Sequence, residues 1–259
     1  MLDGLSEIFS YRCMIRNLVK RDIRGRYKGS LLGFFWNILM PLVQIVVYIL
    51  VFTQVFKPSL DNYALYLTTG MIVWIWFADA ITESSGTMVV NSDMLKKIYF
   101  PRSVLPISVI LSKTITFLIT LGILFAILIG TGFGLSVYAL FVPVAMIIMM
   151  VFMLGFSLIL SSLNAYFRDV QYIVAALMMA WIWITPIMYV KDNFDSALMN
   201  AVLSLNPLTY LFELFQDALF WKCLPDIGTL LICIGIAVTS LVLGIIVFRH
   251  LEKDFAEVL

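Results

Sequence analysis

The sequence predicts an all-α integral membrane protein with six membrane-spanning helices. Of its 259 residues, 62% are hydrophobic and only 13% are charged, whereas a soluble domain carries about 25% charged residues. The mean hydropathy is +1.02. Several apolar runs reach the roughly 20 residues that a helix needs to cross a bilayer. These observations exclude a soluble enzyme, a disordered chain and a fibrous protein.

The six expected spans are apolar runs separated by short polar loops, so one domain holds them all. They are Ser30–Phe56, Tyr63–Ile81, Val104–Gly130, Val137–Leu163, Val170–Val190 and Ile227–Phe248. No short apolar core with a small-residue cleavage site precedes the first span, so we expect no cleavable signal peptide.

Basic residues predict the orientation of these spans, because cytoplasmic loops carry an excess of Lys and Arg. Thirteen of the 17 basic residues lie before the first span, in the second and fourth loops, or in the tail. The opposite side carries Lys57, Lys191 and Lys222, and Lys113 lies within the third span. We therefore expect a multi-pass protein with both termini in the cytoplasm.

The stretch Ala197–Trp221 is apolar, yet it does not fit a seventh span. Asn206 and Pro207 divide it into halves too short to cross a membrane, and Glu213 adds a charge to the second half. We expect two short re-entrant helices in the outer leaflet. An amphipathic helix on the outer surface is the alternative.

The first 29 residues predict a separate cytoplasmic element, followed by a transmembrane domain over residues 30–259. Arg12, Arg16, Lys20 and Arg24 repeat every four residues and form one stripe of a helix. Such a basic amphipathic helix lies in the membrane interface with its cations on anionic headgroups. In the alternative interpretation the segment only fixes the topology.

The loop between the second and third spans predicts a docking helix. A short amphipathic helix held below the membrane is suited to a groove on another protein. Packing beneath the bundle is the alternative. The candidate docking residues are Asp93, Met94, Leu95, Lys96, Ile98 and Tyr99.

Intramembrane charges are few. Lys113 is costly inside a bilayer, and Asp79 and Glu83 are plausible partners near the inner end of the second span. We expect a structural ion pair, and a transport relay is the less favoured alternative.

Aromatic side chains occupy two kinds of position. Tyr63 and Tyr66 fit the aromatic belt at the outer interface. Six others lie too deep for a belt, namely Tyr48, Phe52, Trp74, Trp76, Trp181 and Trp183. Such rings could line a conduit for sugars, although packing or lipid contact is the better explanation for any single ring. The candidate conduit aromatics are Tyr48, Phe52, Trp181 and Trp183.

Several kinds of chemistry lack the residues that they require. No phosphate-binding GxxxxGK[ST] motif occurs, and His250 is the only histidine, so we expect no catalytic residues and no metal site. The three cysteines form neither a disulfide framework nor a CxxC motif. A net charge of +1 argues against nucleic-acid binding.

Three separated segments resemble the ABC-2 type permeases that export polysaccharides. They are "RDIRGRYKGSLLGFFWNILMP" leading into the first span, the "FRD" turn with the "TPI" that follows it, and "LNPLTY". The resemblance implies the six-span fold of type V exporters, a homodimer, and two copies of a separate ATPase subunit that uses ATP and Mg. It implies that this chain binds no cofactor, that the amphipathic helix and the second loop dock the ATPase, and that the first and fifth spans build the pore.

The resemblance leads us to expect export of an undecaprenyl-linked polysaccharide, O-antigen first, across a bacterial inner membrane. Teichoic acid, small lipids or drugs are alternative cargoes. A glycan-modifying enzyme and a secondary transporter fit less well, because no acidic motif, inverted repeat or further buried charge is visible.

Two groups of residues have expected roles in this export. A basic collar would hold the lipid headgroup, and a re-entrant outer gate would lie at the far side. The collar residues are Arg24, Arg26, Tyr27 and Lys28, and the outer gate residues are Asn206, Pro207, Tyr210 and Glu213.

Overall fold

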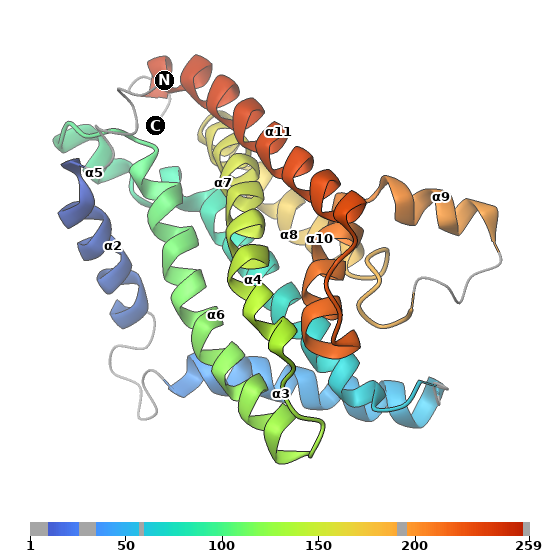
Figure 1. The fold of residues 1–259 in the computed structure, drawn as a ribbon. Helices are drawn as coiled ribbons and strands as arrows, with labels where there is room; N and C mark the ends of the chain where they lie inside the picture. The colour runs from blue at the N-terminus through green and yellow to red at the C-terminus, as the bar shows by residue number, and fades with distance from the viewer. Residues whose placement is uncertain (1–9, 26–34, 57–59, 191–195, 256–259) are drawn as a thin grey trace.

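The computed structural model of the protein describes residues 10–25, 35–56, 60–190 and 196–255. Within these ranges the chain forms ten α-helices joined by short turns, and no strand. The all-α prediction is therefore confirmed for the described part of the chain (Figure 1).

Four of the described helices are long and apolar enough to cross a membrane. They coincide with the second, third, fourth and sixth predicted spans. They are α4 (Tyr63–Val90), α6 (Val104–Gly130), α7 (Val142–Tyr166) and α11 (Ile227–Leu251).

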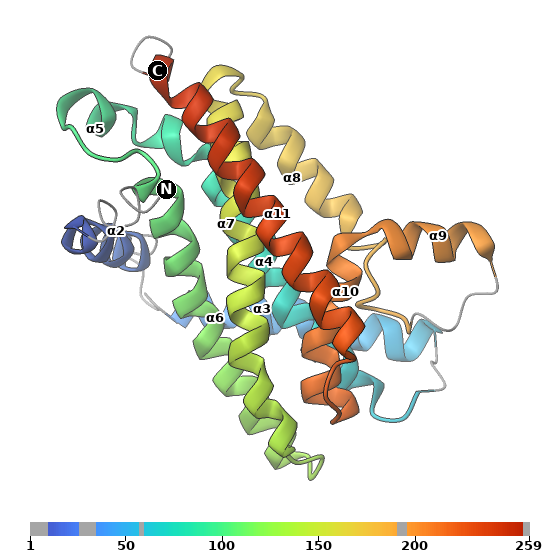
Figure 2. The same cartoon turned by 45° about the horizontal axis from the view of Figure 1, so that its top comes forward.

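Helix α4 forms the centre of the bundle. Some 78% of its most apolar stretch is buried, against 17% for α11. Figures 1 and 2 show α4 behind α6 and α7, with α11 packed along the outside of α7. Because α4 contacts helices on several sides, its sequence is apolar all round rather than along one stripe.

The first predicted span has an unexpected direction. Helix α3 (Trp36–Val51) continues through a π-helical turn to Phe56, and residues 30–34 lie outside the described residues. Both views show α3 running across the long helices instead of alongside them. Its outward face is apolar and exposed, including Val43, Val47 and Leu50.

The fifth predicted span, Val170–Val190, is helical over only part of its length. Helix α8 (Val170–Trp181) ends early, and the chain continues through irregular turns to Tyr189. Pro186 lacks a backbone N–H and disfavours helical backbone at the residue before it. Hydropathy alone does not register this interruption, because the irregular residues are as apolar as the helix.

Helix α2 (Arg12–Gly25) has the predicted amphipathic character. Leu18 and Val19 are buried, whereas Arg12, Arg16 and Lys20 are exposed. The start of α2, the end of α11, the short helix α5 (Ser92–Lys97) and the α7–α8 turn lie at one end of the bundle (Figure 1). This arrangement agrees with the distribution of basic residues, which is concentrated at the same end.

The predicted pair of short helices is present at the other end of α8. Helix α9 (Ala197–Leu205) and helix α10 (Pro207–Gln216) are separated at Asn206. Helix α10 is packed into the bundle, whereas α9 projects from it (Figures 1 and 2). A five-residue π-helical turn, Asp217–Trp221, follows α10.

Helices α7 and α11 cross at two glycines. A Cβ atom at Gly155 would overlap the carbonyl group of Ser240, and one at Gly244 would overlap the carbonyl of Gly155. The Ser240 hydroxyl donates to the Phe152 carbonyl at 3.0 Å beside this crossing. Small residues at such crossings let helix backbones touch inside a membrane.

We predict that Gly155→Ala and Gly244→Ala each destabilise the protein by about 1–3 kcal/mol, because the added methyl forces the two backbones apart. Gly235→Ala in α11 is the matched control, since a Cβ there meets open space. Thermal unfolding of the purified protein in detergent measures the difference. Equal unfolding temperatures for Gly244→Ala and Gly235→Ala would contradict the tight crossing.

Candidate functional site

The irregular segment after α8 is held by side chains from α4. The Tyr63 hydroxyl donates to the Met188 carbonyl at 2.6 Å. The Tyr66 hydroxyl lies 3.2 Å from the carbonyl oxygen of Pro186 and 3.0 Å from that of Tyr189. Non-helical backbone within a membrane needs such partners, because each unpaired carbonyl costs several kcal/mol. Both tyrosines are buried, so their assignment to an interface belt was wrong.

Asn206 joins the same segment to the α9–α10 pair. Its amide nitrogen donates to the Ile184 carbonyl at 2.9 Å and contacts the Thr185 hydroxyl at 3.1 Å. Its side-chain oxygen accepts from the Trp181 indole at 3.0 Å and caps α10 by accepting from the Leu208 N–H at 3.1 Å. Asn206 is 6% exposed, so this one predicted gate residue fixes three segments in a buried position.

The other outer gate residues lie along α10. Pro207 occupies the first position of α10, where its missing N–H is not needed. The Tyr210 hydroxyl donates to the Ser204 carbonyl at 3.1 Å, and Glu213 is half-buried one turn later. The four residues are therefore neighbours in space, as well as in sequence.

Two polar residues that follow Glu213 were not among the predicted gate residues. The amide of Gln216 is buried and donates to the Pro186 carbonyl at 2.9 Å. Burial, together with the nearby Glu213 carboxylate, raises the pKa of Asp217 to about 6. The sequence could have indicated both as site residues, because polar residues in an apolar re-entrant helix are expected to have buried partners.

Three of the four candidate conduit aromatics come together on the α3 side of the irregular segment. The Tyr48 and Phe52 rings stack with centroids 6.1 Å apart, and the Phe52 ring lies 6.4 Å from that of Trp183. Trp183 is 55% exposed, whereas Phe52 is 8% exposed. Residues from the first and fifth predicted spans thus form one aromatic surface.

Trp181 lies apart from that surface. Its ring makes edge contacts with Phe77 and Phe156, both at 6.0 Å, and its indole N–H is bonded to Asn206. Trp181 and Trp183 consequently face different surroundings, and Trp181 is part of the packed interior.

The candidate docking residues lie at the opposite end of the bundle. Tyr99 is 92% exposed and Ile98 is 56% exposed, whereas the next residue, Phe100, is buried. Asp93 and Lys96 are also exposed, and Met94 and Leu95 pack against the cluster that contains Phe100. The segment is therefore anchored on one side and presents an apolar side to the exterior.

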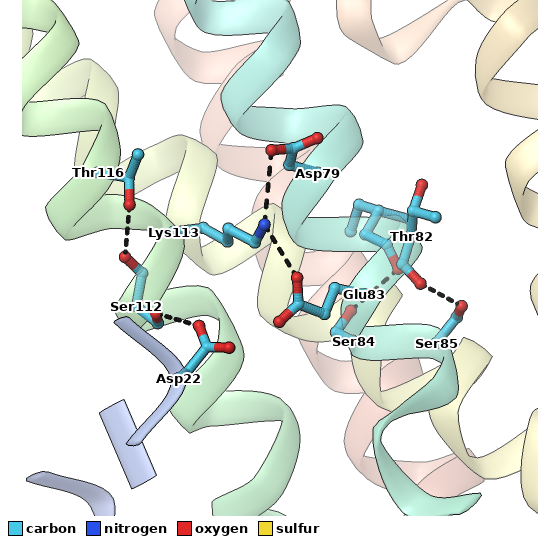
Figure 3. A network of polar contacts seen from close by, with 10 residues as sticks. Asp22, Asp79, Thr82, Glu83, Ser84, Ser85, Ser112, Lys113 and Thr116 are labelled. Atoms are coloured by element: carbon cyan, nitrogen blue, oxygen red, sulfur yellow. Dashed lines mark hydrogen bonds and ion pairs between the residues drawn. The ribbon is translucent and has the colours of Figure 1, made fainter. Parts of the chain in front are cut away.

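The predicted partners of Lys113 are confirmed. Its ammonium lies 2.9 Å from a Glu83 oxygen and 3.4 Å from an Asp79 oxygen (Figure 3). Only 7% of the Lys113 side chain is exposed. Two carboxylates on adjacent turns of α4 thus compensate the buried charge on α6.

The collar is mostly outside the described residues. Arg26, Tyr27 and Lys28 lie in the range 26–34, which the structure does not describe. For Arg24 the structure describes the backbone, as part of α2, but not the side chain. Among the described residues, no group of three His, Cys, Asp or Glu side chains could hold a metal ion.

Comparison with known proteins identifies relatives along the whole chain. The model of the ABC-2 type transporter family matches residues 14–220. The O-antigen export system permease protein RfbA of Myxococcus xanthus is 30% identical over 258 residues, which cover 99% of each chain. RfbA of Klebsiella pneumoniae is 32% identical over 99% of this chain and 97% of its own. The polysialic acid transport protein KpsM of Escherichia coli is 20% identical over 92% and 93% of the two chains.

The family match extends from the first turn of α2 almost to the end of the turn that follows α10. It therefore includes the candidate docking loop, the ion-paired α4–α6 contact, the aromatic surface and the Asn206 junction. The chain belongs to the ABC-2 type transporter family, as a membrane permease that itself carries no ATPase.

Proposed function

We propose that this protein is the permease subunit of an ATP-driven exporter of lipid-linked O-antigen in a bacterial inner membrane. The observation that carries the proposal is the identity of 30–32% with two O-antigen export permeases over essentially the full length of both chains. Identity falls to 20% with the polysialic acid transport protein, which favours O-antigen over a capsule polymer as the cargo.

The permease acts as a homodimer with two copies of a separate ATPase subunit. The interior of one bundle is filled by packed side chains, and packed interiors leave no passage for a glycan. Two copies that face each other enclose a pore between α3 and α8 of each chain. The apolar residues exposed on these helices support such a pairing, among them Val43, Val47, Leu50, Leu177 and Trp183.

The four long helices cross the membrane directly, and both termini lie in the cytoplasm. Helix α8 with its irregular extension completes a fifth crossing, whereas α3 runs across the long helices as an apolar element of the transmembrane domain. Helices α9 and α10 remain in the outer leaflet as the re-entrant pair. The position of α5 beside the end of α11 supports a cytoplasmic location for both.

Export begins at the collar, where cations beside a tyrosine ring suit a pyrophosphate joined to a sugar. ATP binding in the partner moves the docking segment and opens the pore, and hydrolysis resets it. The glycan slides past Tyr48, Phe52 and Trp183, whose rings offer non-directional contact to the C–H faces of sugars. Trp181 lies apart from this surface and instead orients Asn206 through its indole N–H.

We predict that Arg24→Gln combined with Arg26→Gln and Lys28→Gln lowers export more than tenfold at normal protein level, because the headgroup loses its counter-charges. Surface O-antigen in a permease-deletion strain is the measurement. Arg24→Lys with Arg26→Lys keeps the charge and should retain export. Full export by the triple glutamine variant would refute the headgroup role.

We predict that Tyr99→Ala reduces co-purification of the ATPase at least fivefold, because an exposed aromatic anchor commonly contributes more than about 1 kcal/mol to an interface. Tyr138→Ala, which changes an exposed tyrosine on the opposite side of the bundle, is the control. An ATPase that binds both variants equally would place the docking surface elsewhere.

We predict that Asn206→Leu lowers the stability of the protein by about 2–5 kcal/mol and abolishes export. The leucine leaves the Ile184 carbonyl and the Trp181 N–H without their partner, at about 1–3 kcal/mol for each buried group. Thermal unfolding and surface O-antigen are measured together. Asn200→Leu in α9, an exposed position, controls for the loss of an amide. Matching results for the two variants would contradict the role of Asn206.

A further inference from the structure

Helix α2 is fastened to two different elements through adjacent residues. The Arg21 guanidinium donates to the side-chain oxygen of Asn91 at 2.6 Å, and Asn91 stands between α4 and α5. The neighbouring Asp22 carboxylate accepts from the Ser112 hydroxyl of α6 (Figure 3). Successive residues on a helix point about 100° apart, so one turn of α2 reaches both neighbours.

A third contact closes a ring of helices. Lys113 follows Ser112 on α6 and pairs with Asp79 and Glu83 on α4. Glu83 lies about two helical turns before Asn91, where Arg21 binds. Helices α2, α4 and α6 are thus joined pairwise at three edges, and we name this arrangement the polar triangle.

Apolar packing supports the polar triangle from one side. Leu18 lies one turn before Asp22 and is buried in the same cluster as Met88 of α4 and Val104 and Leu105 of α6. Arg21 and Asp22 are therefore presented by a helix whose apolar face is already fixed. Hydrogen bonds that involve an ionised group are about twice as strong as neutral ones. The contacts of Asp22 and Lys113 are partly buried, whereas that of Arg21 is exposed and is therefore the weakest of the three edges.

The outer part of the α4–α6 contact has a different character. Beyond Lys113, the Trp76 and Phe117 rings stack with centroids 4.1 Å apart. This contact is ring packing without an ionised group. The described α4–α6 interface therefore combines an ion-paired part at Lys113 with an aromatic part further along both helices.

We infer that Arg21 and Asp22 are positioning residues that couple the docking helix α5 to α6, so that the ATPase moves α2, α4 and α6 as one body. A triangle fixed at three edges cannot shear unless one contact breaks. A displacement of α5 consequently moves α6 at the position of Lys113, and the loop between α5 and α6 does not absorb it. The inference rests on the proposed function only for the source of the motion, an ATPase bound at α5.

The test follows the motion of α6 in the purified permease–ATPase complex. A fluorophore is attached to Leu118→Cys, an exposed position on α6, in a chain whose Cys13, Cys223 and Cys233 are serine. ATP should change its emission in the otherwise unaltered chain. Arg21→Gln and Ser112→Ala should each reduce that change in emission at least fivefold, while ATPase activity and the amount of bound ATPase stay within twofold of the unaltered complex.

Two matched variants serve as controls and should keep the change in emission. Asn91→Asp keeps the oxygen that accepts from Arg21, and Thr116→Val removes a hydroxyl one turn further along α6.

The outcomes separate the two hypotheses. Unreduced ATP-dependent emission in Arg21→Gln and Ser112→Ala overturns the inference, as does an unaltered chain that shows no ATP-dependent change. A loss of ATPase activity in proportion to the signal also overturns it, because Arg21 would then act only in docking. An unaltered complex with the ATP-dependent signal but no export of O-antigen in the deletion strain refutes the proposed cargo and leaves the coupling supported.

Discussion

The hydrocarbon of a membrane holds no water that could pair with a free carbonyl, and this constraint accounts for the arrangement of α4, α8 and α10. Between Trp181 and Tyr189 the backbone leaves the helix, and its carbonyls need other donors. Tyr63 and Tyr66 on α4, Asn206 before α10 and Gln216 on α10 supply them. The irregular segment that follows α8 therefore depends on the position of α10 against α4.

The region around Lys113 is organised by charge rather than by backbone carbonyls. Lys113 carries a full charge into a packed region, and its two carboxylate partners come from a single face of α4. Arg21 and Asp22 extend this polar contact to α2 and to the α4–α5 junction. The described bundle therefore has directional polar bonds near α2 and α5 and ring packing in its middle.

The sequence predicted those features that depend on local composition. Long apolar runs located four spans, basic residues located the end that holds α2 and α5, and the Asn206–Pro207 step located the division between α9 and α10. The pairing of Lys113 followed because so few charges lie in the membrane. Tyr63 and Tyr66 were misassigned, since an aromatic belt and a buried hydrogen bond use the same amphipathic ring. The Asp22–Ser112 contact depends on the register between two distant helices, which no local pattern encodes.

The contact of α11 with the bundle is a narrow seam around Gly155 and Gly244, and most of its surface is exposed. The two kinds of position on this helix therefore tolerate different substitutions. Where the two backbones touch, at Gly155 and Gly244, only the smallest side chains fit, whereas the exposed positions can exchange Ile, Leu, Val and Phe while the helix remains apolar. Among descendants of this chain, the C-terminal helix should accumulate substitutions quickly around a few glycine and serine positions that hardly change.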